Sequence, residues 1–150
     1  RIIAVAGGTG LAAVYQLARD FGNTDIYFGA RSKDRLYFLE ESTDVSNLHI
    51  STDDGSYGAK GLITELLEEN LKQMSLEERE SLVFYNCGPA PMVRAAEALQ
   101  RKYVHPNRIN NAIDYLTKCG VGICGACDSP EGRRLCVDGP FLDAADTAQI

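Results

Sequence analysis

The chain has 150 residues, of which 45% are hydrophobic and 24% are charged, and its formal net charge is −6. This composition is ordinary for a globular protein with a buried core. The acidic balance argues against nucleic acid as a partner, because no stripe of lysine and arginine is present to meet phosphates. No apolar run approaches the roughly 20 residues that a membrane-spanning helix needs, and no signal-peptide pattern opens the chain.

The chain opens on a strand, a glycine turn and a helix. Residues 2–6 are apolar, the turn GGTG follows at 7–10, and helically spaced apolar residues run on to Gly22, a common helix terminator. Because residue 1 is arginine and a core strand starts at once, we expect this chain to be the C-terminal piece of a longer protein.

Strands and helices then alternate as far as residue 103. The apolar runs DIYFGA, LHIST and LVFYNCG predict strands, and an Asp-Asp-Gly turn follows the second of them. The predicted helices are SKDRLYFLEES with Ser32 as N-cap, KGLITELLEENLKQM, SLEERES with a capping box from Ser75 to Glu78, and MVRAAEALQRKY opened by Pro89 or Pro91. The strands lack polar alternation, as strands covered on both faces do. The predicted fold class is therefore α/β, with a doubly wound parallel sheet of the five-stranded type.

The pattern changes after about residue 105. Pro106 and Asn107 interrupt it, INNAIDYLTK at 109–118 predicts one short helix, and a segment rich in glycine and cysteine follows. We therefore expect two domains, an α/β domain over residues 1–105 and a small C-terminal domain over 106–150.

Three strand ends are candidate ligand-binding segments, because ligands collect at the carboxyl ends of strands in doubly wound sheets. The glycine turn opens a helix and suits a pyrophosphate, but it does not match the full dinucleotide pattern, so a plain β-α connection stays an alternative. The loop from Asp53 to Ser56 can likewise contact a ligand or be a solvated turn. Cys87 ends the fourth strand, and neither His49 nor His105 is its neighbour in sequence, so covalent cysteine catalysis is not expected.

Four cysteines, Cys119, Cys124, Cys127 and Cys136, have the spacing C-x4-C-x2-C-x8-C. Disulfides are one alternative, but they need an oxidising compartment and this sequence has no export signal. A zinc site is a second alternative, although only one short C-x2-C hook is present. The spacing favours a [2Fe–2S] cluster of the plant type, and the small residues between the cysteines let backbone N–H groups point at sulfur.

The ordered set of motifs resembles a known family. GGTGLA, TDDGSYGAKG, CGPAPM and CGVGICGACDSPEGRRLCVDGP occur in this order over residues 7–140. Together they resemble the electron-transfer subunit of the heteromeric dihydroorotate dehydrogenases, a branch of the ferredoxin–NADP⁺ reductase superfamily. The resemblance implies an NAD(P)-binding domain followed by a [2Fe–2S] domain, with an FAD-binding β-barrel upstream of this chain.

The resemblance also implies which residues bind which cofactor. The residues expected at the pyrophosphate are Gly7, Gly8, Thr9 and Gly10. The residues expected beside the nicotinamide are Cys87, Gly88, Pro89 and Met92. Asp53, Asp54 and Gly55 are expected at the nucleotide edge, and the four cysteines are the expected cluster ligands.

The function implied by the resemblance is electron transfer. Electrons would pass from NAD(P)H to FAD, then to the cluster and on to a catalytic dehydrogenase subunit in a cytoplasmic hetero-oligomer, and this chain alone would be inactive. NADH and NADPH both stay open, because Arg31, Ser32 and Lys33 suit a 2′-phosphate whereas the resemblance favours NADH. Related subunits of hydrogenases or electron-bifurcating NADPH oxidoreductases are alternatives, as is a zinc-stabilised nucleotide-binding regulatory module without redox activity.

Overall fold

The structure is a computed structural model, and it describes residues 1–112, 116–130 and 132–144. Within these residues seven strands form one sheet. The strands are β1 (Ile2–Gly7), β2 (Thr24–Ala30), β3 (Asn47–Thr52), β4 (Ala59–Lys60), β5 (Val83–Cys87), β6 (Ile109–Ala112) and β7 (Phe141–Asp143). The α-helices are α1 (Leu11–Phe21), α2 (Leu39–Val45), α3 (Ile63–Gln73), α4 (Leu76–Glu80), α5 (Ala90–Gln100) and α6 (Leu135–Asp138).

The strand order is β4-β3-β2-β1-β5-β6-β7, and every neighbouring pair is parallel except β6 and β7. The chain builds the sheet outward from β1 through β2 and β3, and then returns to place β5 on the other side of β1. The predicted fold class is therefore confirmed, with five central parallel strands and one short strand added at each edge. The reversal of direction beside β1 is where doubly wound sheets bind ligands.

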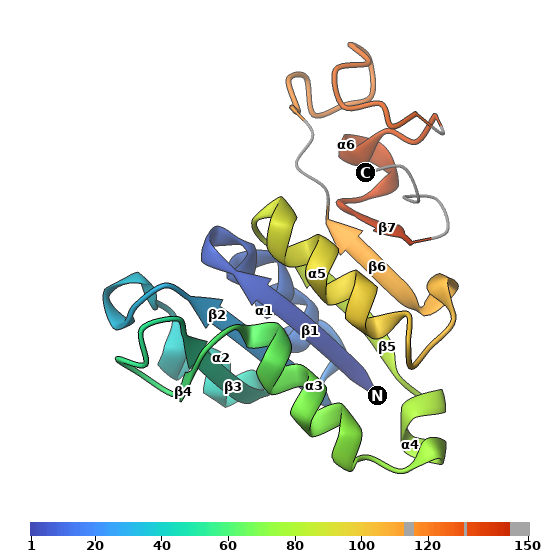
Figure 1. The fold of residues 1–150 in the computed structure, drawn as a ribbon. Coiled ribbons are helices and arrows are strands. Elements are labelled where there is room, and N and C mark those ends of the chain that lie inside the picture. Colours follow the sequence, from blue (N-terminus) through green and yellow to red (C-terminus); the bar gives the residue numbers. More distant parts are fainter. Residues whose placement is uncertain (113–115, 131, 145–150) are drawn as a thin grey trace.

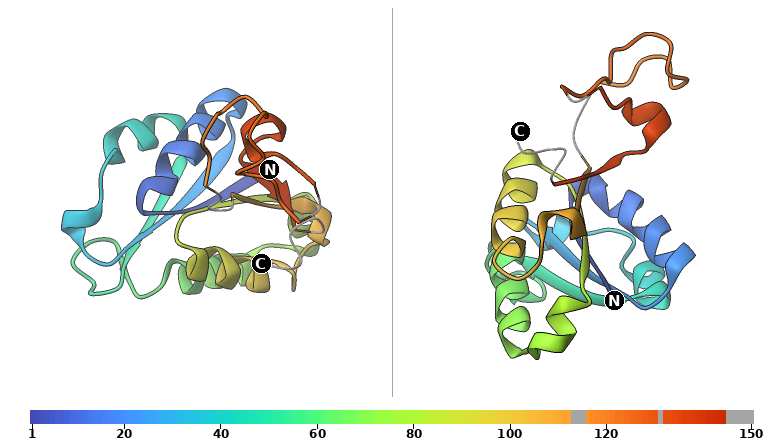
Figure 2. Two further views of the ribbon diagram at one scale, coloured as in Figure 1. Left: turned by 90° about the horizontal axis from the view of Figure 1, so that it is seen from above. Right: turned by 90° about the vertical axis from the view of Figure 1, so that its right-hand side faces the viewer.

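Helices cover both faces of the sheet, with α1 and α2 on one face and α3 and α5 on the other (Figures 1 and 2). Successive strand residues point to opposite faces. Ile3 consequently packs in one cluster with Leu67 of α3, whereas Ala4 packs in the other cluster with Leu11 of α1. Burying one such leucine contributes about 1.5–3 kcal/mol. Because β1 is apolar on both faces, its sequence shows no polar alternation.

The helix predicted over residues 109–118 is wrong where the structure describes that stretch. Residues 109–112 form strand β6, residues 116–118 are not helical, and 113–115 lie outside the described residues. The physical reason is the pairing of β6 with β5 and β7, which provides backbone partners that a local pattern does not reveal. The sheet thus includes residues on both sides of the boundary predicted near residue 105.

The segment after β2 also differs from the prediction. A short 3-10 turn, η2 (Lys33–Arg35), comes first, and α2 begins only at Leu39. The Ser32 hydroxyl donates to the carboxylate of Asp34 and caps no helix. The other predicted signals are confirmed: Ser75 and Glu78 form the capping box of α4, Gly22 ends α1, and Pro89 precedes α5.

The C-terminal part of the chain leaves the sheet after β6 and returns at β7. Residues 116–130 and 132–140, called the cysteine segment below, lie beyond the carboxyl end of β6 (Figure 1). Among the described residues, no helix combines the length and the apolar character that crossing a membrane requires.

A buried ion pair joins β2 to the start of the chain. Asp25 is only 2% exposed, and it accepts hydrogen bonds from Nε of Arg1 at 2.6 Å and from Nδ2 of Asn47 at 3.0 Å. Although burial alone would raise its pKa, hydrogen bonds from His49, Arg1 and Asn47 hold the pKa of Asp25 well below its usual range.

The substitution Asp25→Asn should lower the free energy of unfolding at neutral pH by about 1–3 kcal/mol, because it removes a charged acceptor from a buried network. The lowered pKa stabilises the folded chain at pH above the ordinary carboxyl value, and this stabilisation disappears as the pH falls below about 4. Urea unfolding at neutral and acid pH should therefore show a gap between wild type and variant that shrinks in acid. Asp44→Asn, at an exposed position in α2, is the control, and a gap that stays constant with pH would contradict the assignment.

Candidate functional site

The glycine turn lies at the carboxyl edge of the sheet and joins β1 to α1 through a 3-10 turn, η1 (Gly8–Gly10). Gly8 has φ +52°, which glycine adopts without steric cost, and the space beside its Cα is open. Gly10 is closed in, because a Cβ there would lie 2.1 Å from the carbonyl oxygen of Cys87. A side chain at Gly10 would therefore push the start of α1 away from the end of β5.

The Cys-Gly-Pro segment after β5 packs against this turn. A Cβ on Gly7 would lie 2.6 Å from Sδ of Met92, and a Cβ on Gly88 would lie 2.9 Å from the backbone nitrogen of Gly7. Pro89 is the N-cap of α5, so α5 begins directly after this contact. Thr9, within the glycine turn, is exposed. The structure thus brings GGTG and CGPAPM together where the strand order reverses. That these residues contact a nucleotide stays a prediction.

Cys87 is half-buried at this junction, and burial raises the pKa of its thiol. A raised pKa disfavours the thiolate that a cysteine nucleophile needs. That Cys87 takes no part in covalent catalysis stays a prediction.

Tyr37 is a site residue that the sequence reasoning missed. Its hydroxyl donates to the carbonyl oxygen of Gly8, and its ring packs edge-on against Phe28 with centroids 5.7 Å apart. Burial raises the pKa of Tyr37, so the hydroxyl keeps its proton and stays a donor. The sequence pattern places Tyr37 in the interior of a predicted helix. No signal in the sequence links it to a turn 29 positions away.

The Asp-Asp-Gly loop contacts the segment after β2. The backbone N–H of Asp53 donates to the carbonyl of Ala30 at 3.0 Å, and the hydroxyl of Ser56 accepts from the backbone N–H of Lys33 at 2.8 Å. Asp54 accepts from both the hydroxyl and the N–H of Ser56, which lowers the pKa of Asp54. Gly55 turns the loop with φ +75°. The loop is therefore a hydrogen-bonded turn at the carboxyl ends of β2 and β3.

Arg134 organises the cysteine segment. Its guanidinium donates to the carbonyl of Gly122 and to Oδ1 of Asp128, the latter at 3.0 Å, and its backbone N–H donates to Oδ2 of Asp138 at 2.6 Å. Gly120, Gly122 and Gly125 all have φ near +70°, a conformation that side chains oppose. One cation and the positive-φ glycines thus shape the turns between the cysteines.

The four cysteines of the segment are free thiols, and their surroundings shift the pKa values of two of them in opposite directions. Hydrogen bonds from the backbone of Val121, Cys124 and Ile123 and from the side chain of Cys124 lower the pKa of Cys119 to about 6. A side-chain hydrogen bond with Cys127, together with burial, raises the pKa of Cys136. Within the described part of the chain, no three histidine, cysteine, aspartate or glutamate side chains gather tightly enough to hold one metal ion.

The cysteine segment fits a thiolate-bound iron–sulfur group. The backbone N–H of Gly122 points at Sγ of Cys136 at 3.2 Å, and that of Ile123 points at Sγ of Cys119 at 3.4 Å. Such N–H donors stabilise negative charge on sulfur. The assignment of the four cysteines as ligands stays a prediction.

The contact between Gly10 and the Cys87 carbonyl makes a prediction about stability. Gly10→Ala should lower the free energy of unfolding by about 3 kcal/mol, because a methyl group would overlap a backbone oxygen that cannot rotate away. Gly8→Ala is the matched control, with a cost of about 1 kcal/mol from its positive φ alone. Urea unfolding of both variants measures the difference, and an equal loss in the two would argue against the packing described.

Two protein-family models match the chain. The model of oxidoreductase NAD-binding domains matches residues 4–98. The model of the iron–sulfur cluster binding domain of dihydroorotate dehydrogenase B matches residues 116–148. The first match covers β1 to α5 and the second covers the cysteine segment.

The chain is similar to curated proteins named as dihydroorotate dehydrogenase B (NAD(+)), electron transfer subunit. It is 39% identical over 147 residues to the probable subunit of Methanocaldococcus jannaschii and 34% identical over 148 residues to that of Thermococcus kodakarensis. Both alignments cover 95% of this chain but only 54% and 58% of the relatives. The chain therefore spans a little over half the length of these relatives.

Solved structures share the fold. A chain of the NADH-dependent reduced ferredoxin-NADP oxidoreductase superposes with a TM-score of 0.79 at 26% identity, covering 97% of this chain and 52% of that one. The ferredoxin reductase in carbazole 1,9a-dioxygenase superposes with a TM-score of 0.60 at 22% identity, covering 74% of this chain and 37% of the other, which supports the fold alone. From the strand order, the packed glycine turn and these matches together, the chain belongs to the family of oxidoreductase NAD-binding domains, followed by an iron–sulfur cluster binding domain of the dihydroorotate dehydrogenase B type.

Proposed function

We propose that this chain is the nicotinamide-binding and iron–sulfur part of an electron-transfer subunit that delivers electrons from NADH to the catalytic subunit of a dihydroorotate dehydrogenase. The observation that carries this proposal is the position of two sites on one side of the sheet. The glycine turn lies where β1 ends, and the cysteine segment extends beyond the carboxyl end of β6 (Figure 1). A donor site and an acceptor site on one side can face a common redox partner.

The common partner is a flavin held mainly by the part of the whole protein outside this chain. Bound NADH gives up two electrons as a hydride, a flavin can accept that pair and release single electrons, and a [2Fe–2S] cluster carries one electron at a time. The curated relatives are longer than this chain, which leaves room for such a domain in them. This chain alone would not oxidise NADH.

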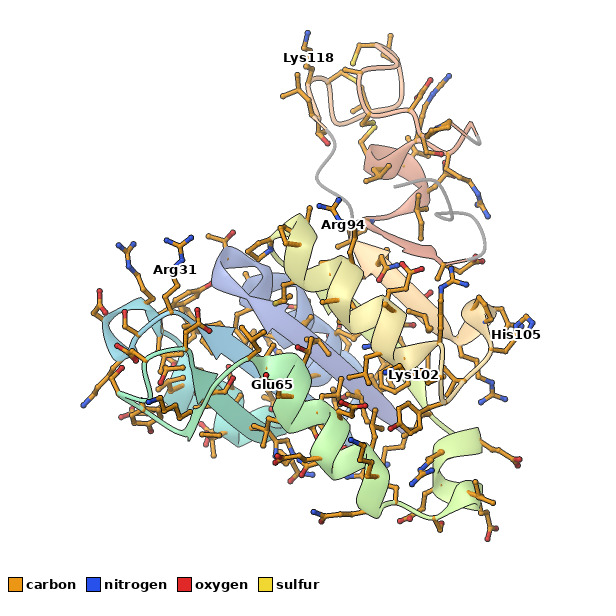
Figure 3. All side chains as sticks on the ribbon, viewed as in Figure 1. Arg31, Glu65, Arg94, Lys102, His105 and Lys118 are labelled. Carbon is orange, nitrogen blue, oxygen red and sulfur yellow. The ribbon has the colours of Figure 1, made fainter. Side chains whose placement is uncertain are left out.

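The residues of this chain bind and orient the nucleotide. The backbone of Gly7 to Gly10 and the first turn of α1 would receive the pyrophosphate, and the surface formed by Gly88, Pro89 and Met92 would receive the nicotinamide ring. Tyr37 fixes the glycine turn through the Gly8 carbonyl. Figure 3 shows Arg31 at the end of β2, beside the Asp53–Gly55 loop, where the adenosine end would lie.

Cys119, Cys124, Cys127 and Cys136 would hold the cluster as its four thiolate ligands. A zinc-stabilised module without redox activity is less well supported, because the cysteine spacing has only one short C-x2-C hook and the matching family model is that of an iron–sulfur cluster binding domain. The likeness to the NADH-dependent ferredoxin-NADP oxidoreductase keeps a related electron-transfer complex as a second candidate.

The proposed electron donor is NADH rather than NADPH, because the two relatives are named for NAD(+). The nucleotide-binding part spans residues 1–105 and the cluster-binding part 106–150. The complex is cytoplasmic, where reducing conditions keep thiols such as the five free cysteines of this chain available as ligands.

Metal analysis tests the cluster directly. Anaerobically purified protein, reconstituted with iron and sulfide, should contain about two iron atoms per chain and absorb visible light broadly. Cys124→Ser should lose this absorption, because one thiolate ligand is removed, whereas Cys87→Ser should retain it and serves as the control. Colourless protein that binds one zinc per chain would overturn the electron-transfer proposal.

Binding of NADH tests the role assigned to Tyr37. Tyr37→Phe should raise the Kd for NADH by about 3- to 10-fold, since the glycine turn loses one hydrogen bond worth about 0.5–1.5 kcal/mol. Tyr15→Phe is the control, because the Tyr15 ring packs on Phe38 at the surface and should leave the Kd unchanged. Calorimetric titration of the full-length subunit measures both, and parallel effects of the two substitutions would count against a specific role for Tyr37.

A further inference from the structure

Polar side chains between β5, β6 and α5 form a buried chain of hydrogen bonds. Asn86 and Gln100 are fully buried and exchange two hydrogen bonds, of 2.7 and 2.8 Å, through their side-chain amides. Nδ2 of Asn86 also donates to Oδ1 of Asn111, 2.8 Å away. Buried amides cost free energy unless they are paired, so this arrangement fixes the three side chains relative to one another.

Glu97 of α5 ends this chain of amides. Its Oε2 accepts from Nδ2 of Asn111 at 2.6 Å, and its Oε1 accepts from Nε of Arg101 at 2.7 Å. The Arg101 guanidinium also donates to the carbonyl oxygen of Ala144 at 2.8 Å. Ala144 directly follows β7, and its N–H donates to the carbonyl of Ile109 at 2.7 Å. The Glu97 carboxylate, which is 18% exposed, thereby binds β6 directly and binds the residue after β7 through Arg101.

The cysteine segment is inserted between these two strands. It leaves the sheet after Ala112 and returns at Phe141, and these two residues face each other in the β6–β7 pair. The position of the cysteines over the sheet therefore depends on how β6 and β7 are held. Asn86, at the other end of the hydrogen-bond chain, immediately precedes Cys87 at the glycine turn.

We propose that Glu97 is a positioning residue for electron transfer, holding the β6–β7 pair so that the cysteine segment keeps a fixed place relative to the nucleotide edge. This inference rests on the proposed function, because position matters only if electrons from the nucleotide reach the cysteine segment through a flavin that faces both. Electron transfer weakens steeply with distance, so a small displacement of the cysteine segment slows it without touching any cluster ligand. Within the described residues, the side-chain partners of Glu97 are Asn111 and Arg101, and neither belongs to the glycine turn or the cysteine segment.

Hydrogen exchange tests the structural half of the inference in the full-length, cofactor-loaded subunit. Glu97→Ala should speed exchange of the backbone amides of residues 109–112 and 141–143, while those of β1 to β3 stay protected. Glu69→Ala, at an exposed position of α3, is the matched control and should change neither set. If amide exchange in β6 and β7 is unchanged in the Glu97→Ala variant, Glu97 does not stabilise the β6–β7 pair and the inference is overturned.

A second variant pair separates positioning from simple destabilisation. Glu97→Gln leaves one acceptor oxygen for two donors, so its amide NH2 must face either Nδ2 of Asn111 or Nε of Arg101. Asn111→Asp turns the first of these neighbours into an acceptor. The double variant restores the order of donors and acceptors from Asn86 to Arg101. Each single variant should speed exchange in β6 and β7, and the double variant should recover part of the protection. If the losses of protection in the two single variants simply add in the double variant, the chain of hydrogen bonds is not the cause of the protection.

Rapid mixing with NADH tests the functional half. In the complex with the catalytic subunit, Glu97→Ala should reduce flavin at the wild-type rate but reduce the cluster about tenfold more slowly. Its iron content and the electron paramagnetic resonance spectrum of its reduced cluster should match wild type, since all four cysteines remain. A wild-type complex that never reduces the cluster overturns the proposed function. If the wild-type complex reduces its cluster and the Glu97→Ala complex reduces its cluster equally fast, only the positioning role of Glu97 is overturned.

Discussion

The close approach of Gly10 to the carbonyl oxygen of Cys87 is the constraint on which the rest of the site depends. It requires a residue without Cβ, and it brings the first turn of α1 against the end of β5. Gly7 and Gly88 extend the same contact on the other side of the turn. As a result, two segments nearly eighty residues apart form one surface at the reversal of strand order. In the proposed function this surface, made largely of backbone, is where the nucleotide binds.

The second site is built by extension of the same sheet. Strands β6 and β7 are the last two strands on one edge, and the cysteine segment is the connection between them. Within that connection, glycines with positive φ and the contacts of Arg134 direct backbone N–H groups towards Cys119 and Cys136. The buried amides of Asn86, Gln100 and Asn111 join the edge carrying this segment to the centre of the sheet. The glycine turn and the cysteine segment are therefore connected through one sheet.

Much of this could be predicted from the sequence because the determinants are local. The apolar runs, the capping box at Ser75 and the helix stop at Gly22 each depend on neighbours within one turn of chain. The family resemblance added the order of the four motifs. Their convergence at one edge follows from the rule that parallel strands end on the same side.

The parts that sequence reasoning missed depend on distant partners. Asn111 is polar yet buried, and the side chains of Asn86 and Glu97 bind its amide while β5 and β7 pair with its strand, which the local pattern of a helix does not reveal. Tyr37 reaches the glycine turn because the chain after β2 runs through a 3-10 turn instead of the expected helix. The N–H contacts of Gly122 with Cys136 and of Ile123 with Cys119 are likewise a property of the folded segment, because spacing alone does not reveal them.

The central claim is that electrons from NADH reach a cluster held by this chain only through a flavin. The most direct measurement is electron paramagnetic resonance of the reconstituted protein, frozen after anaerobic mixing with NADH, for the full-length subunit and for residues 1–150 alone. After mixing with NADH, we expect the signal of a reduced [2Fe–2S] cluster in the full-length subunit and no such signal in residues 1–150 alone. Dithionite should reduce the cluster in both proteins. A cluster that dithionite reduces but NADH does not, in the full-length subunit, would contradict the central claim.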